Sequence, residues 1–139
     1  KLMIKTSVDY TVFFRELSHI PSDVSAIEIS FYKQLDDELK QHWQLWLDKW
    51  RAKLDSNKNL AEVSDNMKRV NPKYTWREWL VVPAYKQAMQ GDYSLVKELQ
   101  DILSNPYNEQ SQEVDNKYYK LRPRKFLWSG GVSHYSCSS

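Results

Sequence analysis

The sequence contains little cysteine, glycine or proline: one Cys, three Gly and five Pro among 139 residues. A single cysteine excludes an internal disulfide, which leaves open a reducing compartment or a partner cysteine elsewhere. The few glycines and prolines supply few built-in turns, whereas six Trp, nine Tyr and four Phe supply large side chains to bury. This balance favours helices over a sheet made of hairpins, so we expect an all-α fold.

Long apolar runs and a strong net charge are also missing. No run approaches the ~20 residues that span a bilayer, and the first residues lead into no signal-peptide core. The net charge is +2, so no overall field attracts the chain to nucleic acid or membrane. We expect a soluble, unsecreted protein with no membrane partner. Because the sequence begins at Lys1 rather than Met, we also expect a piece of a longer protein.

Apolar residues recur at helical spacing through the first half of the chain. This period predicts a short helix over 9–17, one long amphipathic helix over 31–55 and a further helix over 60–70 that ends at Asn71-Pro72. The apolar face of the long helix consists of Tyr32, Leu35, Leu39, Trp43, Trp46, Trp50 and Leu54.

A helical hairpin is predicted next. Thr75 and Glu78 have the spacing of a capping box, so we expect Thr75 to cap a helix that runs to about residue 90. Trp76 and Trp79 should then face inward. Pro83 lies inside this helix and should kink or break it, because its ring removes one backbone donor.

Gly91 fits the left-handed position that closes a helix, and Asp92 or Ser94 can cap the next helix. The helical period disappears after residue 104. We therefore divide the chain into a helical subdomain over 1–104 and an extended tail over 105–139. The expected architecture has one long helix, a C-terminal hairpin and this tail.

Residues that could carry chemistry are scattered. His134 and Cys137 form an isolated H-x-x-C pair, whereas a zinc site needs three or four ligands. Asp36, Asp37 and Glu38 are consecutive, so they point around a helix rather than at one shared point, as general acid and base groups must. No glycine-rich phosphate loop is present. These patterns favour solvated surface residues over a metal or catalytic site.

A basic and aromatic segment lies in the tail. Its cations alternate with aromatic rings that could stack on single-stranded nucleic acid bases. The modest net charge favours the alternative, in which the aromatics anchor the tail to its own protein. The segment contains Lys117, Tyr118, Tyr119, Lys120, Arg122, Arg124, Lys125, Phe126 and Trp128.

Two further features admit plain explanations. Asn71-Pro72-Lys73-Tyr74 matches the N-P-x-Y adaptor motif, but Asn-Pro between two helices is also ordinary helix punctuation. Cys137 lies beyond the apolar period, where an exposed thiol is accessible to oxidants and disulfide partners. The residues alone leave a functional and an incidental role for Cys137 equally open.

Several short motifs follow one another in a fixed order along most of the chain from Asp9. They are Asp9-Tyr10-Thr11, Phe14-Arg15-Glu16-Leu17-Ser18, Asn71-Pro72, Arg77-Glu78-Trp79-Leu80, Ala84, Gly91-Asp92-Tyr93, Leu99, Asn105-Pro106-Tyr107, Arg122-Pro123 and Ser136-Cys137-Ser138-Ser139. Together they resemble the C-terminal part of the selenoprotein O family, whose members end in Cys-Ser-Ser or selenocysteine-Ser-Ser.

The resemblance implies a kinase-like parent protein that transfers AMP from ATP to Ser, Thr or Tyr hydroxyls of other proteins, with Mg²⁺ or Mn²⁺. It implies that the nucleotide-binding, metal-binding and catalytic residues lie upstream, so we expect none in this chain and no activity from it alone. The implied partners are the kinase-like core and the protein substrates. A bacterial member would be cytoplasmic and a eukaryotic one mitochondrial. Cys137 aligns with the family's terminal Cys or selenocysteine, which implies a redox role.

Two hypotheses follow. In the first, the chain is the C-terminal part of a protein adenylyltransferase, with a structural role and a redox-sensitive Cys137. In the second, it is an independent helical module whose basic and aromatic tail binds nucleic acid or an acidic protein.

Overall fold

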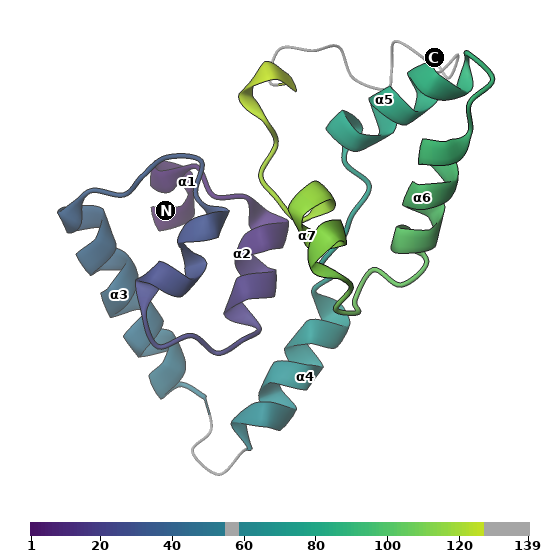
Figure 1. Ribbon diagram of the computed structural model, residues 1–139. Helices are drawn as coiled ribbons and strands as arrows, with labels where there is room; N and C mark the ends of the chain where they lie inside the picture. Colours follow the sequence, from purple (N-terminus) through teal and green to yellow (C-terminus); the bar gives the residue numbers. More distant parts are fainter. Residues whose placement is uncertain (55–58, 127–139) are drawn as a thin grey trace. The chain divides into compact units, whose positions relative to one another are not determined.

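The computed structural model describes residues 1–54 and 59–126, and the chain divides into two compact units, Lys1–Lys73 and Tyr74–Ser139. Both units are helical (Figure 1). The described residues form no β-strand, and their one bridge pairs Val8 with Phe31. The predicted all-α class is therefore confirmed.

The first unit is built from short helices and one long helix. The helix over Tyr10–Leu17 agrees with the sequence prediction, and Asp9 caps it by accepting a hydrogen bond from the Val12 N–H. The elements in order are α1 (Leu2–Thr6), α2 (Tyr10–Leu17), the 3-10 helix η1 (Val24–Ser30), α3 (Asp37–Ala52) and α4 (Leu60–Val70).

The long helix begins later than predicted. α3 starts at Asp37 because the Asp36 carboxylate accepts the Leu39 N–H at 2.8 Å and caps the helix. Phe31 and Leu35 belong to the irregular segment before this cap, and their side chains are buried in the core. Their spacing continues the helical period without helical structure, which is why the sequence prediction over 31–55 is wrong at its start. The long amphipathic helix itself is confirmed over Asp37–Ala52.

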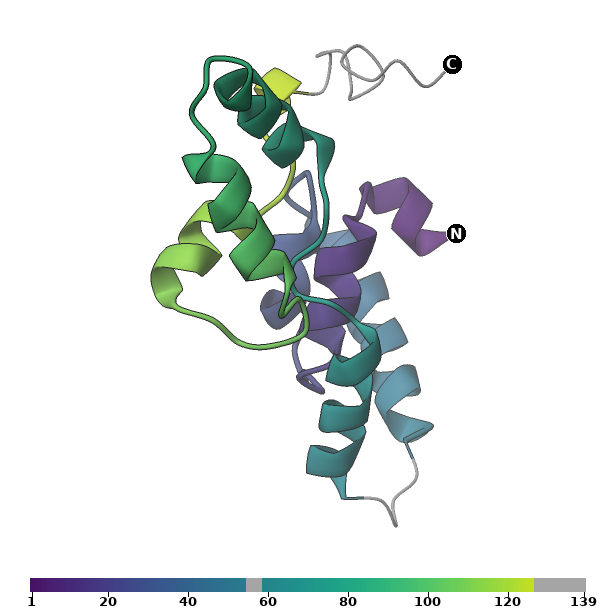
Figure 2. The same ribbon diagram turned by 90° about the vertical axis from the view of Figure 1, so that its right-hand side faces the viewer.

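Aromatic side chains form the core of the first unit. Trp43 is 1% exposed, and its ring centroid lies 5.2 Å from that of Phe13 and 5.3 Å from that of Phe31. α1, α2, η1 and α3 gather around this cluster in both views (Figures 1 and 2). Trp46 and Trp50, which follow Trp43 along α3, pack at the edge of the cluster and stay partly exposed.

α4 is attached to the core in a different way, because none of its residues is fully buried. Arg15 of α2 is 1% exposed, and its guanidinium donates to the carbonyl oxygens of Lys68 at 3.4 Å and Asn71 at 3.1 Å. Met67 adds an apolar contact with the core cluster. The bounds and the stop at Asn71 agree with the sequence prediction.

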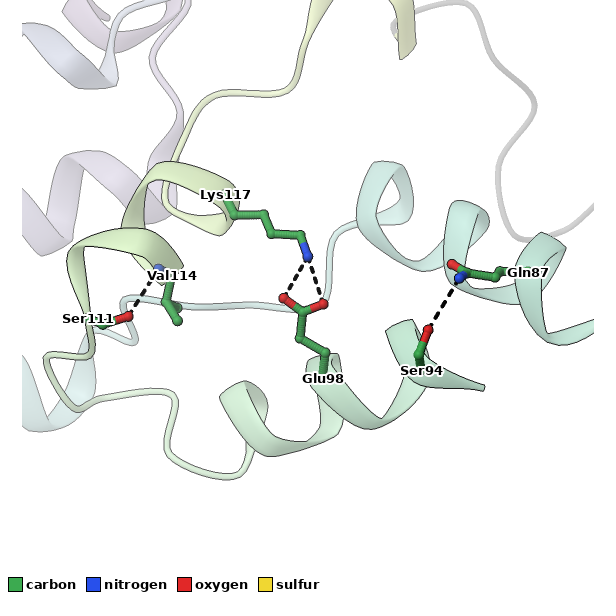
Figure 3. Close-up of polar contacts among 6 residues, drawn as sticks. All are labelled: Gln87, Ser94, Glu98, Ser111, Val114 and Lys117. Carbon is green, nitrogen blue, oxygen red and sulfur yellow. Dashed lines mark hydrogen bonds and ion pairs between the residues drawn. The ribbon is translucent and has the colours of Figure 1, made fainter. Parts of the chain in front are cut away.

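The second unit contains the predicted hairpin. α5 (Glu78–Ala88) and α6 (Ser94–Leu103) pack against each other. Gly91 lies between them with φ +87°, the left-handed conformation that glycine adopts without strain. The Gln87 amide closes the turn by donating to the Asp92 carboxylate at 2.6 Å. It also donates to the Ser94 hydroxyl at 3.3 Å (Figure 3).

The predicted start of the hairpin is wrong. α5 begins at Glu78 with Arg77 in the cap position, so Thr75 does not cap it. Trp76 therefore precedes the helix and is 67% exposed, whereas Trp79 is buried as predicted. The helix continues through Pro83 without the break that remained possible from the sequence.

The tail is not wholly extended. α7 (Gln112–Tyr118) lies within it, and the Ser111 hydroxyl caps this helix by accepting the Val114 N–H at 3.3 Å (Figure 3). A 3-10 turn, η2, follows over Arg124–Phe126. Only two apolar residues of α7 face the core, which is too few to produce a visible period. The domain division after residue 104 stays a prediction.

Candidate functional site

The residue favoured by the sequence, Cys137, lies outside the described residues, and so does His134. The redox role of Cys137, and the expectation that this pair forms no metal site, therefore stay predictions. Within residues 1–54 and 59–126, no three His, Cys, Asp or Glu side chains are grouped to hold a metal ion. None of the helices in these ranges is long and apolar enough to cross a membrane.

The acidic run at the start of α3 has a local role. Asp36 caps the helix, and Asp37 and Glu38 occupy its first turn. Negative charge there is favourable because the first N–H groups of a helix carry partial positive charge. All three side chains belong to exposed residues, in agreement with the expectation that they do not converge on one point.

The N-P-x-Y tyrosine is buried. Tyr74 is 2% exposed, its N–H donates to the Pro106 carbonyl at 3.1 Å, and its hydroxyl donates to the Asp115 carboxylate. Burial, followed by the hydrogen bond to Asp115, raises the pKa of the Tyr74 phenol above its ordinary value. An adaptor domain needs an accessible tyrosine. Tyr74 instead ties the start of the second unit to α7 and to the turn after α6.

An ion pair joins α6 to α7. The Lys117 ammonium donates to both Glu98 carboxylate oxygens, at 2.6 and 2.7 Å (Figure 3). Burial is the largest single influence on Glu98 and opposes its ionisation. The hydrogen bonds from Lys117 and Tyr118 and the charge of Lys117 together outweigh burial and lower the pKa of the carboxyl. The hydrogen bond between Lys117 and Glu98 also raises the pKa of Lys117.

The basic and aromatic segment makes contacts within its own unit. The Lys120 ammonium lies 5.8 Å from the ring centroid of Trp79, and the Arg122 guanidinium donates to the Phe126 carbonyl. The Phe126 ring is 6.3 Å from that of Trp79. Lys125 lies 5.0 Å from the Phe126 ring centroid. These contacts favour the reading in which the aromatic side chains anchor the segment to its own protein.

Two open grooves lie on the first unit. One, of about 500 Å³, is lined on α3 and its C-terminal cap by Trp46, Lys49, Trp50, Ala52 and Lys53. We call this surface the Trp46–Trp50 face. The other, of about 400 Å³, runs along α4 and is lined by Glu62, Val63, Asn66, Met67 and Val70.

Neither groove has the composition of a catalytic centre. Their described linings hold no pair of groups in which one side chain could activate another as a nucleophile or general base. What they offer is apolar surface bordered by a few charges, which suits binding rather than chemistry.

Comparison with known proteins decides the family. The sequence profile described as "Protein adenylyltransferase SelO" matches residues 1–104. The chain belongs to this family. The resemblance inferred from the short motifs is thereby confirmed for the larger part of the chain.

Curated relatives cover almost all of the chain. It is 33% identical over 143 residues to the "Protein nucleotidyltransferase YdiU" of Flavobacterium johnsoniae, with 96% of this chain and 27% of the relative aligned. It is 36% identical over 142 residues to the Myxococcus xanthus protein of the same name, with 99% and 27% aligned. The chain thus spans about a quarter of the length of these relatives.

Sequence reasoning missed the residues that hold the second unit together. Gln110 closes the end of α6 by donating to the carbonyl oxygens of Ile102 at 2.9 Å and Asn105 at 3.2 Å. Asp115 accepts from Tyr74. The available signal was the cluster of polar residues after Asn105-Pro106, because Gln, Ser and Asp next to a helix end commonly satisfy its backbone groups.

Proposed function

We propose that this chain is the C-terminal part of a protein adenylyltransferase that moves AMP from ATP to Ser, Thr or Tyr hydroxyls of other proteins. The observation that carries the proposal is the family match over residues 1–104, together with relatives named as protein nucleotidyltransferases. In this reaction the hydroxyl oxygen bonds to the α-phosphorus of ATP and pyrophosphate leaves. Mg²⁺ or Mn²⁺ would neutralise the phosphate charges.

The chemistry is assigned to the remaining part of the parent, a kinase-like core. This assignment is supported by the length of the relatives, of which the chain spans 27%. The role of the chain itself is then structural, with regulation through Cys137. The partners that we propose for the chain are this core and the protein substrates of the parent.

The proposed regulation is a thiol switch. Two thiols, Cys137 and a cysteine of the core, form a disulfide while a small disulfide such as oxidised glutathione accepts their two electrons and two protons. The new bond would restrain the end of the chain and limit access of substrates.

The test uses the full-length parent with ATP labelled at the α-phosphate. We expect label to appear on protein hydroxyls in the presence of Mg²⁺ or Mn²⁺, and no transfer of label would contradict the proposed activity. We expect reductant to change the rate in the natural protein and to have no effect in Cys137→Ser. If the variant keeps the same reductant dependence, the thiol switch is wrong even when the activity is present.

A further inference from the structure

The Trp46–Trp50 face carries large apolar side chains that the described residues of the first unit cover only in part. Trp43, one turn earlier on α3, is 1% exposed, whereas Trp46 and Trp50 pack only at the edge of the same core. The Trp46 and Trp50 rings are nearly parallel, at 7°, with centroids 6.3 Å apart. Two adjacent indoles at a groove form the kind of anchor that dominates protein interfaces.

Positive charge borders this surface. Trp46, Lys49, Trp50 and Lys53 follow the spacing that places residues on one face of a helix. Lys49 and Lys53 are exposed. No carboxylate is among the described residues that line the groove. An occupant that fits would present apolar side chains to the indoles and Asp or Glu to the lysines.

A second copy of the chain fits poorly in the simplest arrangement. In a two-fold symmetric dimer each face would meet its own counterpart. Lys49 and Lys53 would then approach the same lysines of the other copy, and like charges across an interface are unfavourable.

A larger source of occupants is the rest of the parent protein. The chain spans 27% of the relatives that it matches, so most of a family member lies outside it. We propose that the Trp46–Trp50 face is the docking surface for the remaining part of the same parent protein, through a segment that combines apolar residues with Asp or Glu. This inference shares one premise with the proposed function, namely that the chain is part of a longer parent protein.

Lysine reactivity tests the proposal directly. The 139-residue chain and the full-length parent are each treated with a limiting amount of an amine-acylating reagent, and modification is measured at each lysine by mass spectrometry. We expect Lys49 and Lys53 to react several-fold more slowly in the parent than in the chain. Lys33, which is exposed and lies outside the groove, serves as the internal reference.

Equal reactivity of Lys49 and Lys53 in the chain and the parent would overturn the proposal. Protection that appears in the chain alone as its concentration rises would also overturn it, because the occupant would then be a second copy. Protection in the parent at all concentrations supports docking within one molecule.

Charge reversal gives a second measurement. Lys49→Glu/Lys53→Glu is compared with Lys33→Glu/Lys97→Glu, which makes the same change in net charge at two exposed lysines outside the groove. The shift in melting temperature is measured in the chain and in the parent, so that effects on the helix itself are subtracted. We expect the groove pair to lower the melting temperature of the parent by several degrees more than the control pair. If the two pairs give equal shifts in the parent after the shift in the chain is subtracted, the proposal that the occupant carries Asp or Glu is wrong.

Failure of this inference is distinguishable from failure of the proposed function. Lysine protection does not depend on AMP transfer, so a parent that lacks transfer but protects Lys49 and Lys53 would retain the docking surface. A parent that transfers AMP with both lysines unprotected would retain the function and lose the docking surface.

Discussion

The Tyr74 hydroxyl shows how one polar atom can organise a small helical unit. It donates to Asp115 of α7 from a side chain that is 2% exposed. We predict that Tyr74→Phe lowers the free energy of unfolding by about 1–2 kcal/mol, because the Asp115 carboxylate loses a donor in a partly buried position. Urea unfolding measures the change.

Tyr85→Phe is the matched control, since Tyr85 is 45% exposed on α5. It should leave the free energy of unfolding almost unchanged. Folding raises the pKa of Tyr74. The protonated hydroxyl therefore contributes fully to the free energy of unfolding below about pH 10, and this contribution is lost as the pH rises through the folded pKa. Equal effects of the two substitutions at pH 7 would show that the Tyr74 hydrogen bond adds nothing.

The ion pair between Glu98 and Lys117 gives a prediction with a pH window. The side chains are 41% and 50% exposed, so solvent screens the pair and Glu98→Gln should cost only about 0.5 kcal/mol. Folding lowers the pKa of Glu98, so the contribution is present above the unfolded pKa of about 4.3 and is lost as the pH falls through the folded pKa.

Thermal unfolding at pH 7 and at about pH 3 measures this difference. The gap between the natural chain and Glu98→Gln should close at the lower pH. Asp101→Asn, an exposed carboxylate on the same helix, is the control. A gap that stays constant with pH would mean that the carboxylate charge is not the source of the stabilisation.

Individual tryptophans mark the limit of sequence reasoning at this scale. Trp43, Trp46 and Trp50 lie on one periodic stripe, and the sequence correctly predicts that the stripe faces the core. It does not predict that Trp43 is enclosed by Phe13 and Phe31 while the other two remain at the edge. That difference depends on which segments fold over each turn of α3, and periodicity contains no such information.

Among the elements, α4 is the least enclosed helix of the first unit. It has no fully buried residue, and Arg15 of α2 donates hydrogen bonds to the carbonyl oxygens of Lys68 in α4 and Asn71 at its end. We predict that Arg15→Gln increases amide hydrogen exchange in α4 more than in α3, because two carbonyl contacts with a charged donor are lost. The local cost should be about 1–3 kcal/mol.

Hydrogen exchange followed by mass spectrometry can locate the change. Arg15→Lys, which keeps the charge but presents a single ammonium, should give a smaller increase. If the amides of α3 and α4 accelerate equally in Arg15→Gln, Arg15 stabilises the whole unit rather than the attachment of α4.

At the scale of elements, the sequence predicted best where amphipathic periods and stop signals agree. The helix over 60–70 and its end at Asn71-Pro72 needed only these signals. The sequence prediction placed the start of α3 too early, because Phe31 and Leu35 are buried although they lie in an irregular segment. α7 was missed because its side chains are mostly polar and its stability comes from contacts with distant residues.

For the whole molecule, the deciding fact is its size relative to the family. A chain that spans 27% of its relatives is proposed to lack the nucleotide site, so we predict no shift in melting temperature when ATP and Mg²⁺ are added. A ligand at 100 times its Kd stabilises a protein by about 2.7 kcal/mol, which a thermal shift assay detects easily. The parent should show this shift, and a shift in the chain would reveal a nucleotide site within it.

The Arg15 contacts also limit how early the first unit can fold during synthesis on the ribosome. Arg15 and its two carbonyl acceptors are separated by 53 and 56 residues. At ~5–20 residues per second, a ribosome needs roughly 3–11 s to add the second partner after the first. During this interval α2 exists while the end of α4 does not, so the guanidinium should remain hydrated. The first unit should therefore reach its final packing only after Asn71 has emerged.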